Sequence, residues 1–393
     1  MKKKFDIAII GAGLAGLLTS IISSKLGFKT VIIDKRNFSN QKNYSKDCRT
    51  TALSSGSVKY LNKFGLLENI EKIAGEIANI KVMEDHDSLL GLDFEKDNNQ
   101  FESMGYVIEN KDLYHQFMLA AKKEENLEFI EEKEYKEIKT LSQVVKITLE
   151  KDQIIEAKLL IAADGKNSKI RESQNIEVIK KDYQQKAIIF NIKHQKSHQN
   201  LALERFYPAG PFAVLPLKDK MKSSIVWTLE QQYADDYLKI DKKSFEKIIQ
   251  EKMGDYLGEI EIITEPRNYS LDMMVAKKFI SDKIAFIGET IHAMHPIAGQ
   301  GYNLSVRDIE VLMENLIFAF RAGNEINNSQ VLEQYQKSRY FDIYSLISST
   351  HILNKLFAND LGFVKIARKI GLSLFGQVKM LKKIAIQYAT KGL

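Results

Sequence analysis

Apolar residues in the first part of the chain fall into short runs, and stretches with helical spacing separate these runs. Residues 6–10 and 30–33 are rich in isoleucine and valine, as is typical of buried parallel strands, and a helix is predicted between them. The same alternation continues with further strands predicted at 106–108, 144–149 and 158–163, and a helix at 111–122. It predicts α/β organisation to about residue 175.

The pattern changes between about residues 176 and 275, where β-rich runs stand apart from one another. Runs at 187–192, 210–217 and 223–229 predict a mainly antiparallel sheet. From residue 283 the α/β pattern returns, with a strand at 284–287 and a long helix from about Asn303. Beyond about residue 330 the chain is predicted to be helical.

These patterns predict an α/β fold, α+β overall, in which a Rossmann-like domain encloses an inserted sheet domain and a helical C-terminus follows. The predicted Rossmann-like domain is discontinuous and comprises residues 1–75, 105–175 and 276–330. The inserted domain comprises residues 76–104 and 176–275, and the C-terminal helical region comprises residues 331–393.

The six residues after the first predicted strand form a glycine motif, Gly11-Ala12-Gly13-Leu14-Ala15-Gly16. Gly11 permits a tight turn, Gly13 lets the backbone approach a pyrophosphate, and Gly16 lets the next helix pack closely on the strand. The phosphates of a dinucleotide are then expected at the N-terminus of that helix. Its free N–H groups and the helix dipole compensate their charge there.

An acidic residue closes the second predicted strand. Asp34 lies eighteen residues after Gly16, near the spacing at which an acid binds the ribose of a dinucleotide. A carboxylate there favours an unphosphorylated adenosine ribose, as in FAD or NAD. A secretory signal peptide is the alternative, because three lysines precede a largely apolar run to Leu18, but Asp6 and the glycines interrupt that run.

The composition narrows the class of protein. With 393 residues, of which 44% are apolar and 27% charged, the chain can build two packed domains. Cys48 is the single cysteine, which excludes an intramolecular disulfide and a cysteine-built metal site, and a reducing cytoplasm is expected. The net charge of +6 does not indicate nucleic acid as a partner. No metal and no transmembrane helix are predicted.

Two further segments place a strand end next to a glycine turn. Residues 160–165 are an apolar strand that ends in Asp164-Gly165, which alone is typical of an ordinary turn. Residues 288–303, GETIHAMHPIAGQGYN, provide a compact loop and a Gly-Gln-Gly at a new helix start. The N–H groups of such a helix start suit an electron-rich carbonyl edge, such as the pyrimidine side of a flavin.

The three motifs in this order resemble those of the single-component FAD-dependent aromatic hydroxylases, the group that contains para-hydroxybenzoate hydroxylase. Within that group the chain is most similar to the ubiquinone-biosynthesis hydroxylases. The resemblance extends over nearly the whole chain. It includes the segments RTTALS at 49–54, GPFAVLPL at 210–217 and SIVW at 224–227.

The resemblance implies that the Rossmann-like domain binds FAD and that the inserted sheet binds the substrate. It places the FAD pyrophosphate at the glycine motif, the adenosine ribose at Asp34, and Arg49 near the flavin and the path of the nicotinamide cofactor. The other cofactor-binding positions that it implies are Lys35, Lys111, Asp164, Gly165, Gly288, Glu289, Pro296, Gly299, Gln300, Gly301 and Asn303.

The chain departs from the family pattern at two places. The family usually has Gly-Asp in the third motif, where the aspartate binds the ribityl chain, and this chain has Gly288-Glu289. Where relatives commonly carry an arginine and a glutamine on the helix after Ile108, this chain has Lys111 and Tyr114.

In the family, NADPH or NADH reduces FAD, and the reduced flavin activates O₂ as a C4a-hydroperoxide that hydroxylates a phenol. The resemblance therefore implies a monooxygenase acting on a polyprenyl-phenol intermediate of ubiquinone biosynthesis. A soluble aromatic-acid hydroxylase and a non-catalytic flavoprotein-like subunit of a biosynthetic complex are the alternatives. The oligomeric state is left open.

The C-terminal stretch from Ser348 to Leu393 has eight lysines and arginines against one acid, with apolar residues between them. A basic amphipathic helix can lie on an anionic membrane. We therefore expect a cytoplasmic protein that binds the inner face of the membrane peripherally and works with other ubiquinone-biosynthesis proteins. A helical cap with a solvated basic face is an equally good interpretation.

Two sets of side chains each allow two interpretations. His292 and His295 flank the flavin loop, and they serve either as a catalytic acid or base, together with Arg49, or as packing residues of the loop. Aromatic residues of the inserted sheet line either a substrate cleft or an ordinary sheet core. These are Phe206, Tyr207, Phe212 and Trp227.

Overall fold

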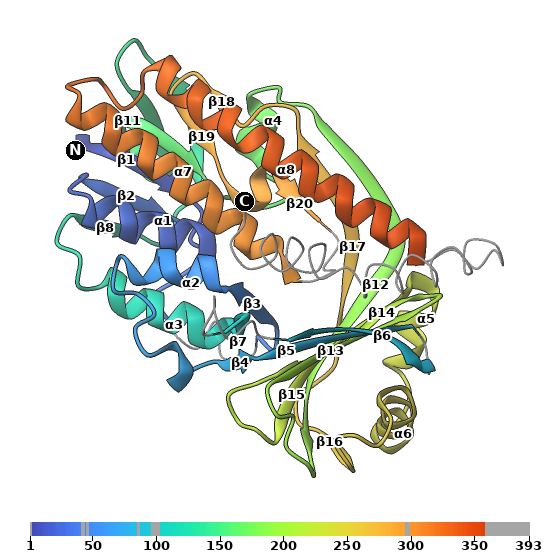
Figure 1. The fold of residues 1–393 in the computed structure, drawn as a ribbon. Coiled ribbons are helices and arrows are strands. Elements are labelled where there is room, and N and C mark those ends of the chain that lie inside the picture. Colours follow the sequence, from blue (N-terminus) through green and yellow to red (C-terminus); the bar gives the residue numbers. More distant parts are fainter. Residues whose placement is uncertain are drawn as a thin grey trace.

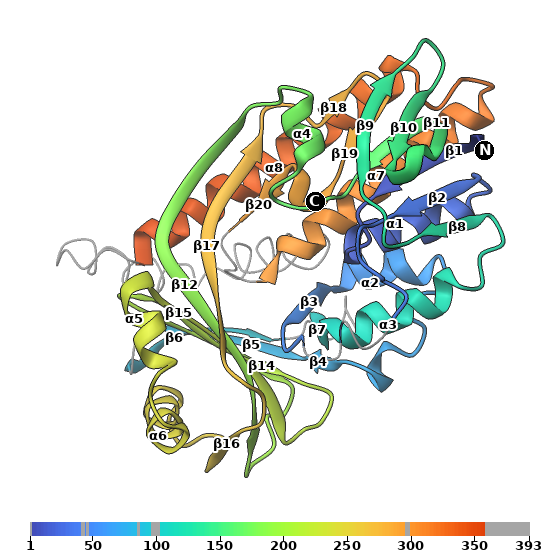
Figure 2. The ribbon, with the colours of Figure 1, turned by 180° about the vertical axis from the view of Figure 1, so that it is seen from behind.

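The computed structural model describes residues 2–40, 44, 47–84, 87–95, 103–294 and 299–357. These residues form three sheets with helices packed against them (Figures 1 and 2). The α-helices are α1 (Leu14–Lys25), α2 (Ser55–Asn62), α3 (Asn110–Ala121), α4 (Lys169–Ser173), α5 (Gln231–Tyr237), α6 (Lys242–Met253), α7 (Gly301–Arg321) and α8 (Ser329–Phe357). Short 3-10 turns occur at η2 (Ile70–Lys72), η3 (Glu150–Asp152) and η4 (Gly288–Thr290).

The first sheet is built around five parallel strands in the order β19, β11, β1, β2 and β8. Helix α1 packs on β1, β2 and β8 and lies between α3 and α7 (Figure 1). The central strands are buried on both faces, which explains their continuous apolar sequence. The strands are β1 (Lys2–Ile10), β2 (Thr30–Ile33), β8 (Leu127–Ile130), β9 (Tyr135–Thr140), β10 (Val145–Leu149), β11 (Ile154–Ala162), β18 (Ile280–Ser281) and β19 (Ile284–Phe286).

The second sheet has nine strands, and α5 and α6 cover one of its faces. Its long strands β12 and β17 extend from the first sheet to the far end of the molecule (Figure 2). Tyr207, Phe212 and Trp227 lie in the core beneath these two helices. The strands are β5 (Asn79–Glu84), β6 (Asp87–Glu95), β12 (Val178–His194), β13 (Leu201–Tyr207), β14 (Gly210–Pro216), β15 (Lys222–Glu230), β16 (Ile260–Ile262), β17 (Arg267–Ala276) and β20 (His292–Ala293).

A small third sheet connects the two larger ones. It consists of β3 (Thr50–Ser54), β7 (Gly105–Glu109) and β4 (Gly75–Ile77). The Oγ1 of Thr50 lies 3.3 Å from the Oγ of Ser224, and the Nδ2 of Asn191 donates to Glu109 over 3.1 Å. Because Ser224 and Asn191 belong to the second sheet, the face of that sheet opposite α5 and α6 is turned toward β3 and β7.

The predicted fold class is confirmed by the mixed α/β structure, but some elements differ from the prediction. The sequence pattern missed α5 and α6, although Phe245, Ile249 and Met253 of α6 have helical spacing and are buried together. The weakly patterned segment 76–104 supplies β5 and β6, and β5 pairs in parallel with β13 in an otherwise largely antiparallel sheet.

The first half of α8 completes the core of the first sheet. Leu332, Tyr335 and Ile343 are buried in the same apolar cluster as β1 and β11. The hydroxyl of Tyr335 donates to the carbonyl of Phe286 at the end of β19 over 2.8 Å, and neither group reaches solvent. The C-terminal helix therefore holds the strand that leads into the third motif.

We expect Tyr335→Phe to lower the free energy of unfolding by about 1–2 kcal/mol, because the buried Phe286 carbonyl loses its partner. Chemical denaturation of the purified variant measures this loss. Tyr233→Phe is the matched control, since Tyr233 is 50% exposed, and it should change stability by less than about 0.5 kcal/mol. Equal stability of the two variants would contradict the assigned role of Tyr335.

Candidate active site

The three sequence motifs meet at the carboxyl ends of adjacent parallel strands. Gly11 follows β1, Asp164 comes after β11, and Gly288 comes after β19. Backbone hydrogen bonds join these ends, from Ala163 N to Ile10 O at 2.8 Å and from Ile287 N to Ala162 O at 3.1 Å. Ligands of open α/β sheets bind at this edge.

The three glycines of the first motif are required for different reasons. A Cβ on Gly16 would lie 1.8 Å from the carbonyl oxygen of Gly11, so any larger residue would separate α1 from β1. Gly11 has a φ of +105°, and a Cβ there would lie 2.3 Å from the Ala163 oxygen. No atom lies within 4 Å of a Cβ built on Gly13. Gly11 and Gly16 thus serve the fold, and Gly13 leaves open space in front of α1.

Asp34 lies at the end of β2, beside the glycine motif. Its Oδ2 accepts the Ala12 N–H over 2.7 Å, and Arg36 forms a bidentate pair with the carboxylate at 2.9–3.0 Å. Burial raises the pKa of Asp34, but the hydrogen bonds from Arg36 and Ala12 outweigh it and hold the pKa below its ordinary value. Lys35, which the family resemblance selects, is exposed, and sequence reasoning missed Arg36.

Tyr114 of α3 also contacts the glycine motif. Its hydroxyl donates to the Ala12 carbonyl over 3.0 Å, and its ring stacks on Tyr44 with 3.7 Å between centroids. Lys111 is paired with Glu109 over 2.9 Å. Tyr114, one of the two residues that depart from the family pattern, thus supports the backbone of the glycine motif directly.

The second motif presents a carboxylate with one oxygen that has no partner. Asp164 Oδ1 is buried and has no hydrogen-bond partner in the structure, while Gly165 has a φ of +85°. Burial is the main reason that the pKa of Asp164 lies above its ordinary value. A buried acceptor of this kind is costly unless a donor from a ligand satisfies it.

The third motif begins with the 3-10 turn η4. Gly288 and Thr290 are buried, and Glu289 between them is exposed at the edge where the three motifs meet. The Thr290 carbonyl accepts from Nη1 of Arg171 over 2.8 Å. The turn therefore holds its backbone in the core and directs one acidic side chain outward.

The Gly299-Gln300-Gly301 segment leads into α7. A Cβ built on Gly301 meets no atom within 4 Å. Both polar atoms of the Asn303 side chain form hydrogen bonds with the backbone of β3. Its Nδ2 donates to Ala52 O over 2.8 Å, and its Oδ1 accepts from Ser54 N over 2.9 Å. The structure thus directs this amide toward β3. The predicted residues His295 and Pro296 lie outside the described residues.

Arg49 immediately precedes β3. Its guanidinium forms a bidentate pair with Asp47, with contacts of 2.7–3.2 Å, and lies 5.5 Å from the ring of Tyr269. The hydrogen bonds with Asp47 raise the pKa of Arg49 above its ordinary value. The sequence analysis selected Arg49 but missed Asp47. The only signal for this pair was that Asp47 is an acid two residues before Arg49.

His292 is 1% exposed, and its Nε2 lies 2.6 Å from Oδ2 of Asp308 on α7. The ring is enclosed, and its Nε2 is engaged by a buried carboxylate. Its placement favours the packing interpretation over the acid or base role.

Comparison with known proteins identifies the family. A family model described as FAD binding domain matches residues 4–341, most of the chain. Ubiquinone hydroxylase UbiL of Rhodospirillum rubrum is 30% identical over 98% of this chain and 90% of the relative. The chain belongs to the FAD-dependent ubiquinone-biosynthesis hydroxylase family. As a member of this hydroxylase family, it is a monooxygenase that uses FAD, NAD(P)H and O₂.

A second hydroxylase is similar along most of the chain, and a solved structure shares its fold. Ubiquinone hydroxylase UbiM of Neisseria meningitidis is 25% identical over 98% of this chain and 84% of the relative. The crystal structure of p-nitrophenol 4-monooxygenase PnpA from Pseudomonas putida has a TM-score of 0.82 at 17% identity, with 99% of both chains covered. This likeness shows the shared fold.

The residues of the site fit the FAD that the hydroxylase family binds. Gly13 leaves open space before α1, and no side chain caps the N-terminus of that helix, so its N–H groups are available for a pyrophosphate. The orphaned Asp164 oxygen can accept from a hydroxyl group of the cofactor. Among the described residues, no three His, Cys, Asp or Glu side chains form a metal site.

We expect Gly13→Ala to fold normally but to weaken FAD binding by about tenfold or more, because the methyl group occupies the space that the pyrophosphate needs. FAD titration and thermal melting of the apoprotein measure the two effects. Gly16→Ala is the matched comparison, and it should destabilise the apoprotein itself by several kcal/mol through its backbone clash. Unchanged FAD affinity in Gly13→Ala would refute the placement of the pyrophosphate.

Proposed function

We propose that the enzyme hydroxylates the aromatic ring of a polyprenyl-phenol intermediate of ubiquinone biosynthesis. The names of the hydroxylases UbiL and UbiM, to which the chain is similar, support this substrate class. The observation that carries the proposal is a row of apolar side chains on the sheet face that is turned toward β3 and β7.

Ile189, Val226 and Ala213 form a row on the three adjacent strands β12, β15 and β14, where Val226 pairs directly with both others. All three are half-buried. Strand alternation puts Trp227 and its neighbours on the opposite face, in the core beneath α5 and α6. Tyr207, Phe212 and Trp227 therefore belong to the core of the sheet. Their position favours this interpretation over the lining of a substrate cleft.

The row lies on the same face as Ser224 and Asn191, which contact β3 and β7. On this face Ala187 pairs with Tyr269, the residue whose ring lies beside Arg49. The substrate side of the sheet therefore faces the segment that enters β3.

This row suits a hydrocarbon-substituted phenol better than an aromatic acid. A buried carboxylate needs a cation and hydrogen-bond donors, and the row contains neither. Arg267 on β17 pairs directly with Ile189, and it already binds Glu265. Arg49, whose guanidinium lies beside Tyr269, is already paired with Asp47. The soluble aromatic-acid hydroxylase is therefore the weaker candidate.

When bound and reduced by NAD(P)H, FAD supplies the activated oxygen atom for the ring. The residues of the chain then have two tasks. The apolar row orients the ring and its tail, and the packing of the second sheet against β3 and β7 keeps water from the reacting atoms.

The purified, FAD-loaded enzyme should consume NAD(P)H under air in the presence of a polyprenyl phenol and form hydroxylated product in equal amount. A short aromatic acid such as 4-hydroxybenzoate should give kcat/KM lower by about 100-fold, because the apolar row gives its carboxylate no partner. Efficient turnover of the acid without turnover of the polyprenyl phenol would overturn the proposal.

A variant pair tests the row itself in the same assay. Val226→Lys should lower kcat/KM for the polyprenyl phenol by about tenfold or more and leave FAD binding unchanged, since a charge in the row must be desolvated. Val226→Leu keeps the row apolar and should retain activity within about threefold. Similar activity of both variants would show that the substrate does not bind at this row.

We also propose that the basic C-terminal stretch from Ser348 to Leu393 binds an anionic membrane surface, where a polyprenylated substrate resides. No helix in the described part of the chain is both long and apolar enough to cross a membrane. Attachment would therefore depend on charge and on shallow insertion of apolar side chains.

Vesicles that contain phosphatidylglycerol should bind the full chain at low salt and release it at high salt. Replacing Lys365, Arg368 and Lys369 by glutamine should weaken binding by about 3 kcal/mol, at about 1 kcal/mol for each charge. Co-sedimentation measures the binding, and neutral phosphatidylcholine vesicles provide the control. Equal binding of both proteins would refute this membrane contact.

A further inference from the structure

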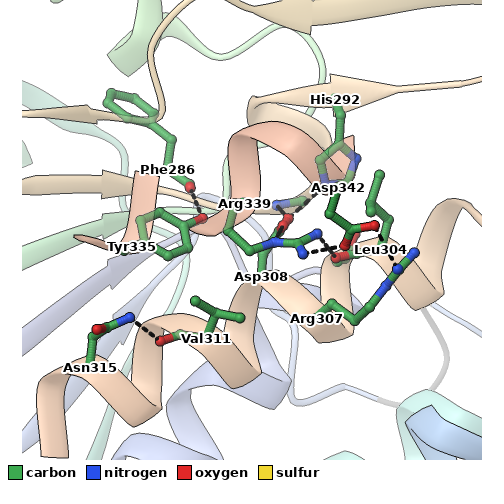
Figure 3. A network of polar contacts seen from close by, with 12 residues as sticks. Phe286, His292, Leu304, Arg307, Asp308, Val311, Asn315, Tyr335, Arg339 and Asp342 are labelled. Atoms are coloured by element: carbon green, nitrogen blue, oxygen red, sulfur yellow. Dashed lines mark hydrogen bonds and ion pairs between the residues drawn. The ribbon is translucent and has the colours of Figure 1, made fainter. Parts of the chain in front are cut away.

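A network of charged side chains is buried beneath the third motif (Figure 3). Asp308 of α7 is completely buried, and its Oδ1 accepts from Nε of Arg339 on α8 over 2.8 Å. Arg339 also pairs with Asp342, which in turn accepts from Arg307 over 2.8 Å. Two carboxylates and two guanidinium groups thus balance in charge where α7 and α8 cross.

One end of this network touches the flavin-binding edge. Oδ2 of Asp308 accepts the Gly288 N–H over 2.9 Å and lies 2.6 Å from Nε2 of His292. Gly288 and His292 bracket the turn η4, and Glu289 projects from that turn. Asp308 therefore holds both sides of the segment that presents the acidic side chain.

Hydrogen bonds also hold Thr290, at the other end of the turn η4. Arg171, itself 1% exposed, donates to the Thr290 carbonyl, and the Thr290 hydroxyl donates to Ile287 O over 2.7 Å. Gly288 adopts a φ of +61°, in the left-handed region that favours glycine. With the backbone fixed in this way, the reach of Glu289 depends on where the turn is anchored.

Asp308 is suited to act as that anchor because it stays ionised. Burial raises the pKa of Asp308, but its interactions with His292 and Arg339 outweigh burial and hold the pKa below its ordinary value. An ionised carboxylate accepts several hydrogen bonds at once, and each charge-assisted bond is stronger than a neutral one.

We infer that Asp308 is a positioning residue for flavin binding, which acts through Gly288 and His292 to fix the turn that carries Glu289. The inference rests on the FAD site of the proposed function and on the predicted contact of Glu289 with the cofactor. It assigns His292 to the same task, in place of an acid or base role.

The network offers a matched control. Asp342 is 9% exposed and, like Asp308, is an acid that binds Arg339, but it contacts Arg339 and Arg307 away from the turn. Asp308→Asn and Asp342→Asn both disturb the pairing of α7 with α8. Of these two substitutions, Asp308→Asn also disturbs the anchor of the turn.

The test is a double-mutant cycle on FAD binding to the apoprotein, without substrate. Asp308→Asn should raise the Kd for FAD about tenfold, Asp342→Asn less than about threefold, and Glu289→Ala about tenfold. In the Glu289→Ala background, Asp308→Asn should add less than about twofold, because the residue that it positions is gone. Thermal melting of each apoprotein records the accompanying loss of stability.

Three outcomes would overturn the inference. These are equal weakening by Asp308→Asn in both backgrounds, equal weakening by Asp342→Asn, and an unchanged Kd in Glu289→Ala. Because no substrate is present, a failure of the polyprenyl-phenol proposal would not alter these binding results.

A second pair of variants applies if Asp308→Asn does not fold. His292→Gln keeps an N–H donor near the place of Nε2 and should retain FAD affinity within about twofold, whereas His292→Leu should weaken it about fivefold. The visible spectrum of bound flavin should shift in His292→Leu and match the parent in His292→Gln. Identical affinity and spectra for the two variants would also refute the inference.

Discussion

The close approach of α1 to the end of β1 is the constraint on which the rest of the structure depends. Gly16 lies so near the Gly11 carbonyl that no side chain fits between them. This contact brings the N-terminus of α1 to the edge where β1, β11 and β19 end side by side. Only with that geometry do Asp34, Asp164 and Glu289, which are far apart in sequence, lie at the one edge of the sheet where FAD is expected to bind.

The parts of the structure that depend on local chemistry were predictable from the sequence. Apolar runs located the parallel strands, and the glycine motif located the turn between β1 and α1 that Asp34 contacts, because each signal lies within about thirty residues. The side chains that complete these motifs were less accessible to such reasoning. Arg36 and Asp47 pair with predicted residues, but nothing local distinguishes them from the neighbouring exposed charges.

Features that depend on tertiary contacts could not be predicted from the pattern. The partner of His292 is sixteen residues away on α7, and Arg339 reaches the same carboxylate from another helix. Strand alternation showed that the sheet has two faces, but the positions of α5 and α6 were needed to decide which face is core. The apolar row of Val226 could be separated from the aromatic core only after that decision.

The parallel pairing of β1 with β11 has a consequence for how the protein is made. Lys2 pairs with Ile154, and the strand that completes this side of the sheet begins only at Ile284. Although β2 pairs with β1 early, the first motif lacks the second and third motifs beside it until β19 has been synthesised. Because such distant pairings form slowly, the nascent chain must keep its apolar N-terminal strands from aggregating throughout translation.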